Sequence, residues 1–355
     1  MSQIKVAFWN VENLFDATTD PSDIALDFEF TPAHGWTEEM YQKKLINLAQ
    51  VVAQMHNGLM PDLLGVCEVE NKKVLEDLTA NLPGNDYAIA HHESSDKRGI
   101  DTSLLFRTSV FDLTAEPIPH VIHLRYPTRD IYEVHLKVKS NNAELVVFVN
   151  HWPSRMNGTY ETEPFRITVA EHAGRLVDNI LKLPRTGWTD PVKPTLAEIN
   201  AQWNRNVLLM GDFNDEPYCR SIVDYLQAST GIDRLEEDIK TSNGTAIPAL
   251  SDYLKKEAYL FNGMGTFLGR PDEGTHYYSD ATNTMNVLDQ FIVSKGLYFG
   301  KQQLKWKADA VQIFKQAVMA PGDKKRPKGL VRKNGMITDP GFSDHFPITG
   351  VLDMV

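Results

Sequence analysis

The chain has 355 residues, 42% of them hydrophobic, and a formal net charge of −11 at pH 7. It can bury a sizeable core, and no stretch reaches the roughly 18 apolar residues of a membrane span, which argues against membrane insertion. The acidic net charge argues against a protein that binds duplex nucleic acid through a wide basic surface. Two cysteines, Cys67 and Cys219, form no disulfide framework, and we expect neither to do chemistry.

The first predicted element is a strand over residues 4–9, which ends at Asn10. Residues 1–5 lead directly into it, without the basic start, apolar segment and cleavage site of a secretory signal, so we expect a cytoplasmic protein. A helix is predicted over residues 38–55, because apolar residues recur there on one face. The apolar run 63–67 then indicates a buried strand that ends at Glu68.

The middle of the chain repeats this pattern. The apolar run 145–149 predicts a strand that leads to Asn150 and His151. A helical pattern follows over residues 166–181. Polar residues again stand where a buried strand ends.

The next apolar run, 208–210, ends in a glycine, a carboxylate and an amide. Asp212 and Asn214 are two residues apart, so both point to the same side at the exposed end of the strand. Short helical patterns follow over residues 221–227 and 251–260. This strand end is predicted to form the rim of an active site.

Two further polar groups complete the series. Asp289 lies within the apolar segment 287–293, and Asp344 and His345 precede the apolar residues 346–348. Six strand-like segments thus each carry an Asn, Asp, Glu or His at an edge. Such donors, with almost no cysteine among them, suit Mg²⁺ or Mn²⁺ rather than structural zinc.

Seven motifs, in order from residue 9 to residue 345, resemble the endonuclease/exonuclease/phosphatase superfamily. They are Trp9-Asn10-Val11-Glu12-Asn13-Leu14-Phe15, the Glu68 strand, Arg98-Gly99-Ile100-Asp101, Asn150-His151-Trp152-Pro153-Ser154-Arg155, Gly211-Asp212-Phe213-Asn214, Leu288-Asp289 and Ser343-Asp344-His345. Any one of them is a weak signal, because a Gly-Asp turn or an Asp-His pair occurs by chance in many chains. Seven in register are a strong one, and their forms look most similar to a bacterial branch.

The resemblance implies an α/β (α+β) fold of the deoxyribonuclease-I-like type, a four-layer sandwich of two packed mixed β-sheets flanked by helices. Turn residues concentrate between 183 and 194, and we interpret this stretch as the junction of two half-domains, approximately 1–183 and 205–355. Because the candidate site residues come from both halves, the halves must fold around one another. We therefore predict a single domain over residues 1–355.

The resemblance also implies a metal site and a histidine that moves a proton. Glu68 and Asn10 would hold Mg²⁺ or Mn²⁺, with Asp344 nearby. Asp289 would orient His345, since a carboxylate behind an imidazole favours the imidazolium that forms as the proton moves. The reaction would use either one metal ion or two, and the sequence does not distinguish these alternatives.

The remaining motif residues are expected to contact the substrate. Asp212 and Asn214 would position the nucleophile and a phosphoryl oxygen, while His151 would donate a hydrogen bond to the phosphate. The general base is either His345 or Asp212. The candidate catalytic residues are therefore His345, Asp289, Asp212, Asn214 and His151.

Three further motif residues are candidates for binding the phosphate: Arg98, Arg155 and Asn150. Arginine suits this role because its donors form a fork that matches phosphate oxygens, although surface arginines without such a role are common. Glu12 and Glu70, each two residues beyond a proposed ligand, are expected to be surface carboxylates.

A basic segment precedes the Asp344 motif. Between residues 315 and 333, seven lysines and arginines stand against one acid, in a Pro/Gly-rich stretch that indicates a long loop. The loop is either solvated surface or a flap over the site that draws in a polyanion. The candidate residues for recruiting substrate are Lys324, Lys325, Arg326 and Lys328.

The function implied is a metal-dependent phosphodiesterase, in the first instance a nuclease on single-stranded or small nucleic-acid substrates. The alternative is a phosphatase or phosphodiesterase of small phosphorylated metabolites such as nucleotides, sugar phosphates or inositol phosphates, which suits the acidic net charge. A third hypothesis is a non-catalytic binding protein on the same scaffold, against which the complete residue set argues. We infer a phosphoester substrate, with nucleic acid as one candidate, and no protein partner.

Overall fold

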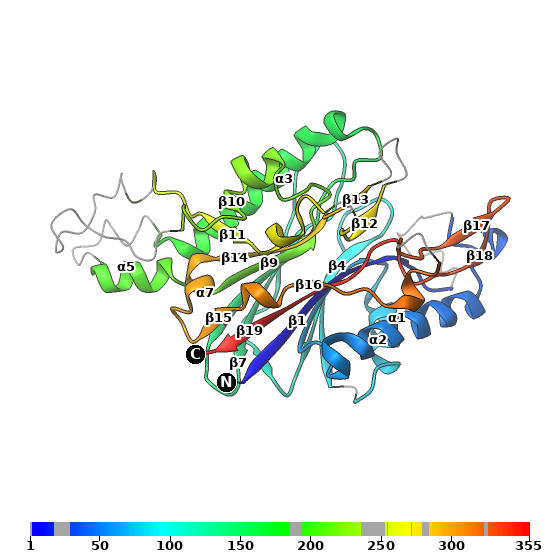
Figure 1. Cartoon of the computed structure of the whole chain (residues 1–355), viewed down its shortest axis with the longest axis horizontal. Helices are drawn as coiled ribbons and strands as arrows, with labels where there is room; N and C mark the ends of the chain where they lie inside the picture. Colours follow the sequence, from blue (N-terminus) through cyan, green and yellow to red (C-terminus); the bar gives the residue numbers. More distant parts are fainter. Residues whose placement is uncertain are drawn as a thin grey trace.

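The computed structural model describes residues 2–17, 29–84, 86–184, 194–235, 253, 255–270, 272–278, 284–322 and 326–355. Two large mixed β-sheets pack against each other, and helices cover the outer face of each (Figure 1). The predicted four-layer sandwich is therefore confirmed. Among the described residues, none of the helices is both long and apolar enough to cross a membrane.

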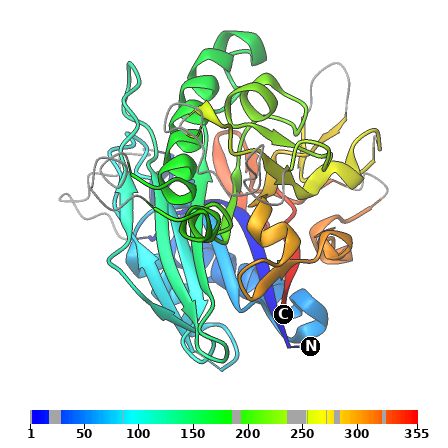
Figure 2. The ribbon, with the colours of Figure 1, turned by 90° about the vertical axis from the view of Figure 1, so that its left-hand side faces the viewer.

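Sheet A combines strands from the two ends of the chain. Its order is β15 (Leu304–Trp306), β19 (Ile348–Met354), β1 (Gln3–Leu14), β2 (Leu63–Val69), β4 (Asp101–Arg107) and β3 (Tyr87–His91), with β16 (Gln312–Ile313) also paired to β19. β1 is parallel to β2 and antiparallel to β19. As a result the two chain ends lie side by side, which both views show (Figures 1 and 2).

Sheet B is built from the middle of the chain. Its order is β10 (Ala228–Ser229), β11 (Leu260–Asn262), β14 (Asp289–Ser294), β9 (Val207–Asp212), β8 (Glu144–His151), β7 (Ile131–Val138) and β5 (Phe111–Leu113), with β6 (Ile118–His120) paired to β7. Two small hairpins stand apart from the sheets: β12 (His276–Tyr277) with β13 (Met285–Asn286), and β17 (Val331–Lys333) with β18 (Met336–Asp339). Both predicted halves contribute strands to both sheets.

The helices cover opposite sides of the sandwich (Figure 1). On sheet A lie α1 (Glu38–Gly58) and α2 (Lys72–Ala80), and on sheet B lie α3 (Thr159–Leu181) and α5 (Leu196–Trp203). The short elements are α7 (Lys295–Phe299), the π-helix η2 (Ser221–Tyr225) and the 3-10 turns η1 (Pro32–His34), η3 (Gly263–Phe267), η4 (Ala308–Ala310) and η5 (Ala317–Met319). The helix predicted over 38–55 is confirmed, and α3 begins one to two turns before the predicted residue 166. Within the helical pattern predicted over 251–260, residues 251, 252 and 254 lie outside the described residues, residues 256–259 are not helical, and residue 260 begins β11.

Both faces of the central strands are buried, which explains why their sequences are continuous apolar runs. Along β1, Val6 and Phe8 face the core between the two sheets. The alternate residues Ala7 and Trp9 pack in the second core, under α1 and α2. Each central strand therefore has a row of side chains that points between the sheets, and this row positions the site.

Candidate active site

Four polar side chains continue these inward rows past the end of the core. In sheet B, His151, Asp212 and Asp289 occupy paired positions on the adjacent strands β8, β9 and β14. In sheet A, Asn10 lies on the inward face of β1, and its amide donates to Asp212 Oδ2 at 3.1 Å. Because alternate residues of a strand share a face, all four point into the space between the sheets. The structure thus brings these predicted residues together.

Glu68 reaches the same place through a distortion of β2. Its backbone is left-handed, with φ of 62°, and the register of β2 against β4 shifts between Cys67 and Val69, as at a β-bulge. The carboxylate accepts hydrogen bonds from the amide of Asn10 and the backbone N–H of Asn13, each at 3.1 Å. A non-glycine residue in this conformation costs about 1–3 kcal/mol, which the fold tolerates where the bulge directs Glu68 into the site.

His345 lies between two carboxylates. Its Nδ1 is 2.7 Å from Asp289 Oδ2, and its Nε2 is 3.8 Å from Asp212 Oδ2. The preceding Ser343 holds the loop in place, since its hydroxyl accepts from the backbone N–H of His345 and donates to the carbonyl of Asn10. The loop that carries the histidine is therefore anchored to β1.

The protonation of these groups is shifted by burial and by their neighbours. Burial would lower the pKa of His345, but the carboxylates of Asp289 and Asp212 outweigh it and hold that pKa well above the ordinary value. Burial raises the pKa of Asp212 to about 7, although the charge of His345 acts in the opposite direction. Burial, together with nearby arginines, lowers the pKa of His151 well below its ordinary value. Such opposed shifts are typical of sites that move protons.

The residues expected to hold a metal fit a hard divalent cation. Glu68 offers a carboxylate that accepts from the amide nitrogen of Asn10, whose Oδ1 accepts from the backbone N–H of Glu12, and Asp344 is half exposed. Burial and the charge of Asp344 raise the pKa of Glu12 to about 8, and Glu68 adds to this effect. Several carboxylates thus crowd one region, and oxygen-rich, negatively charged sites are those that Mg²⁺ and Mn²⁺ occupy.

Asn214 is held at the end of β9 by its neighbours. Its backbone N–H donates to Asp212 Oδ1 at 2.9 Å, and its side-chain amide donates to the carbonyl of Trp152 at 3.0 Å. The same carbonyl accepts from Arg129, which pairs with Asp96. Arg129 belongs to none of the seven motifs, and no local pattern predicted this supporting contact.

Asn150 does not face the site. Because it precedes His151 on β8, it points to the opposite face of sheet B. Its side chain is fully buried, donates to the carbonyls of Phe148 and Met210, and accepts from Trp152 Nε1. This corrects the expectation that Asn150 binds phosphate, since none of its polar atoms is directed to the substrate side.

Arg155 also differs from expectation. Its guanidinium pairs with Asp215 at 3.0 Å and donates to the carbonyl of Asn214 at 2.6 Å. Arg166, fully buried on α3, pairs with the other oxygen of Asp215 at 2.8 Å. Only 8% of the Arg155 side chain is exposed. Its guanidinium therefore holds the loop of Asn214 in place and is not available to bind phosphate. The sequence missed Asp215, which directly follows Asn214.

Glu12 and Glu70 are buried, not on the surface as expected. Glu12 accepts from the backbone N–H of Leu330 and lies 3.5 Å from the ammonium of Lys44, a fully buried lysine of α1. Gly329 makes this approach possible, because a Cβ there would lie 2.6 Å from Glu12 Oε1. Long-range partners from α1 and from the loop before β17 therefore permit burial that local sequence did not indicate.

The other cationic candidates lie around the mouth of the site. Arg98 is exposed and donates to the side chain of Asn13. The guanidinium of Arg326 stacks on the ring of Tyr277 at 3.5 Å, and Lys328 pairs with Asp339 at 2.7 Å. The other two basic-loop candidates, Lys324 and Lys325, lie outside the described residues.

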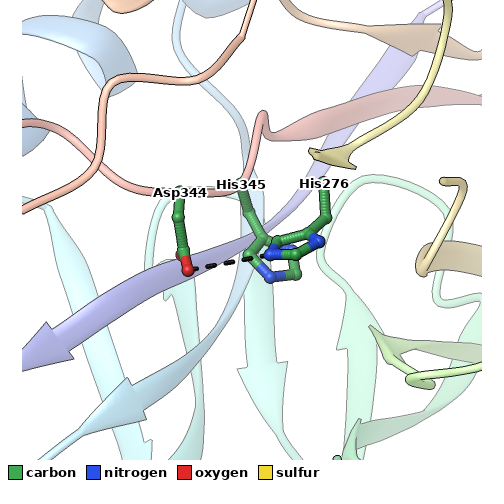
Figure 3. A group of neighbouring side chains, drawn as sticks. All are labelled: His276, Asp344 and His345. Atoms are coloured by element: carbon green, nitrogen blue, oxygen red, sulfur yellow. Dashed lines mark ion pairs between the residues drawn. The ribbon is translucent and has the colours of Figure 1, made fainter. Parts of the chain in front are cut away.

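His276, which lies outside the seven motifs, also reaches the site (Figure 3). Its Nε2 is 3.8 Å from Asp344 Oδ2, and its ring centroid is 4.6 Å from that of His345. Burial and the charge of His345 lower its pKa well below the ordinary value. The available signal was a histidine in a Gly-Thr-His-Tyr-Tyr loop just before the Asp289 strand.

Solved structures with this architecture come from several organisms. An endonuclease/exonuclease/phosphatase family protein from Bacteroides thetaiotaomicron has a TM-score of 0.53 at 16% identity, covering 99% of this chain and 97% of its own. A mannosyl-6-phosphatase of the same organism has a TM-score of 0.53 at 17% identity, with coverages of 98% and 99%. TDP2 of D. rerio, complexed with single-strand DNA product, has a TM-score of 0.53 at 12% identity, and both chains are covered fully, at 100%. These likenesses establish the fold.

No curated protein matches the chain significantly. The family profile described as Endonuclease/Exonuclease/phosphatase family matches residues 5–188 and 192–353. This match spans all seven motifs and agrees with the fold and with the group of polar residues between the sheets. The chain therefore belongs to the endonuclease/exonuclease/phosphatase family, whose members are hydrolases of phosphoester bonds.

Proposed function

We propose that this protein is a Mg²⁺- or Mn²⁺-dependent phosphodiesterase, and in the first instance a nuclease acting on single-stranded or small nucleic-acid substrates. The observation that carries the proposal is the convergence of Asp289, His345 and Asp212 beside the Glu68 carboxylate and the Asn10 amide. Hydrolysis of a phosphodiester requires an activated water, neutralisation of developing charge and a proton for the leaving oxygen. In this proposal, these residues activate the water, bind the ion that neutralises charge and provide the proton.

In the proposed mechanism Glu68, Asn10 and Asp344 hold the metal. When bound, the ion neutralises charge on the phosphoryl oxygens and lowers the pKa of water. His345 moves the proton, and Asp289 fixes its ring so that Nε2 faces the substrate side, where Asp212 lies 3.8 Å away. Either Nε2 or Asp212 accepts the proton of the attacking water, and the other group stabilises the charge that results.

The other residues orient the phosphate. His151 Nε2 is 3.7 Å from Glu68 Oε1 and 3.8 Å from Asp212 Oδ2, so the imidazole lies at the centre of the site. Its lowered pKa keeps it neutral, as a hydrogen-bond donor that does not compete for the proton. Asn214 is fixed by Asp212 and Trp152, and Arg98 at the mouth is a candidate for contact with a phosphate oxygen.

The preference for a nucleic-acid substrate is supported by the cations and aromatic rings near the mouth. Arg326 and Tyr277 form a stacked pair, and Tyr278 packs edge-on against the ring of His276. Flat side chains next to cations suit bases joined by a phosphate backbone. The net charge of −11 favours the alternative, a phosphatase of small phosphorylated metabolites, because it disfavours a long polyanion.

The test is hydrolysis of bis(p-nitrophenyl) phosphate and of a labelled oligonucleotide, with added Mg²⁺ or Mn²⁺ and with EDTA. We expect turnover with metal and its loss in EDTA. Full activity in EDTA would refute the metal dependence. A matched panel of mononucleotides and sugar phosphates separates the two substrate classes, since faster turnover of those compounds than of any oligonucleotide would replace the nuclease by the phosphatase.

A further inference from the structure

We propose that His276 is a metal ligand of this site, which shares a divalent cation with Asp344 and shifts the preference of the site from Mg²⁺ towards Mn²⁺. The proposal rests on the proposed function only in that a divalent cation binds here. It adds a nitrogen donor to a site whose other proposed ligands are oxygens (Figure 3).

The backbone around His276 is fixed from two sides. In the β12–β13 hairpin His276 pairs with Asn286, and an isolated bridge joins it to His345. The preceding residue, Thr275, accepts from the backbone N–H groups of Phe346 and Asp289. His276 is therefore held against both the strand that carries Asp289 and the loop that carries His345.

The distance between His276 and Asp344 suits a shared ion. At 3.8 Å, Nε2 and Oδ2 are too far apart for a hydrogen bond, which requires about 2.7–3.2 Å. Two ligand atoms that each lie roughly 2.1 Å from one cation are at most about 4.2 Å apart. Both side chains are accessible to an ion, with 18% of His276 and 48% of Asp344 exposed. The separation of the two atoms is thus within the span of one cation.

Among the described residues, neither ring nitrogen of His276 has a hydrogen-bond partner, and Nδ1 is shielded from water. His345 differs, because its Nδ1 is already bound to Asp289. A cation between Nε2 and Asp344 would give the imidazole a partner and would leave His345 to move protons.

The choice of ion follows from ligand chemistry. Mg²⁺ prefers an octahedron of oxygens and keeps several waters, whereas imidazole is a good ligand for first-row transition ions. With oxygen ligands alone, the site would bind the two ions through similar contacts. The added nitrogen of His276 therefore favours Mn²⁺ over Mg²⁺.

The competing explanation is that the His276 ring only packs against His345. The variant His276→Phe separates the two, because phenylalanine keeps an aromatic ring and removes both nitrogens. His172→Phe, on the outer helix α3, is the matched control. Asp344→Asn tests the other half of the pair.

The experiment measures Mn²⁺ binding to the metal-stripped full chain by electron paramagnetic resonance, with and without excess Mg²⁺. In His276→Phe we expect the Kd for Mn²⁺ to rise at least about tenfold, with a smaller change for Mg²⁺ measured by competition. The nitrogen coupling in the electron spin-echo modulation of bound Mn²⁺ should weaken or vanish. Asp344→Asn should weaken both ions, and His172→Phe should change neither.

An unchanged Mn²⁺ affinity and nitrogen coupling in His276→Phe would overturn the proposal, as would an equal loss for both ions. Circular dichroism checks that each variant is folded. If His276→Phe does not fold, His276→Gln replaces it, and the Mn²⁺ preference over Mg²⁺ must then fall for the proposal to stand. Because binding is measured without turnover, the ligand assignment and the phosphodiesterase function can fail separately.

Discussion

Replacing Asp289 by Asn tests the central proton-moving pair. The substitution keeps the shape of the side chain but removes the charge that lies 2.7 Å from His345 Nδ1. Asp289 has no exposed surface, so water cannot take over its role. The amide oxygen can still accept from Nδ1, which keeps the ring in place and isolates the effect of charge.

The expected magnitudes follow from the contacts. Asp289 Oδ1 has no hydrogen-bond partner among the described residues, so the variant places an unpaired N–H₂ group there, at a cost to stability of about 1–3 kcal/mol. General acid–base catalysis is worth about 10²–10⁴-fold, and we expect kcat to fall by a factor in that range. Since Asp289 raises the pKa of His345, its loss lowers that pKa, and the limb of the pH–rate profile that belongs to His345 moves to lower pH.

The effect of the substitution on stability depends on pH. A histidine whose folded pKa lies above its unfolded value stabilises the fold at pH below the unfolded pKa, and this contribution is lost as pH rises through the folded pKa. The variant should therefore lose most stability, relative to the parent, on the acid side. Urea melts across pH and rates on bis(p-nitrophenyl) phosphate measure both effects. Unchanged kcat and an unmoved profile in a folded variant would show that Asp289 does not act on His345.

Three other outcomes are expected. Glu68→Gln should raise the metal concentration needed for half-maximal activity, because an amide is a poorer ligand for a hard cation, and an identical metal titration would remove Glu68 from the ligand set. Arg155→Ala should destabilise the fold by about 3–5 kcal/mol in urea melts, because it breaks a buried pair with Asp215; a variant of parental stability that loses only substrate affinity would restore Arg155 as a phosphate ligand. Replacing the four basic residues of 324–328 by Ser should weaken oligonucleotide binding and reduce its salt slope by about 0.7 per lost phosphate contact, with little effect on bis(p-nitrophenyl) phosphate, and equal loss on both substrates would assign the loop a structural role.

Strand ends were the part of the site that could be predicted from sequence. An apolar run that stops at a polar residue marks where a strand leaves the core, and Asn10, Asp212 and Asp289 were found in this way. Their convergence also follows, because the sheets that carry them share one core. The family motifs then indicated which ends meet, which local patterns alone do not specify.

The differences between the predicted and the observed positions of site residues have two physical origins. Asn150 and His151 are adjacent, and the alternation of a strand sends them to opposite faces, a rule that excludes a shared role. Glu12 and His276 depend on contacts between segments distant in sequence, such as the approach of Leu330 to Glu12. No local pattern predicts that a carboxylate will be buried when its partner comes from another part of the chain.

The position of β19 in sheet A has a consequence for synthesis on the ribosome. β1 is synthesised long before residues 348–354, which pair one of its edges. At about 5–20 residues per second, the nascent chain waits on the order of 20–70 seconds with this apolar edge open, which makes it a substrate for chaperones. His345 is synthesised just before these residues. Under the proposed function, a nascent chain is thus unable to hydrolyse phosphoesters until His345 has emerged.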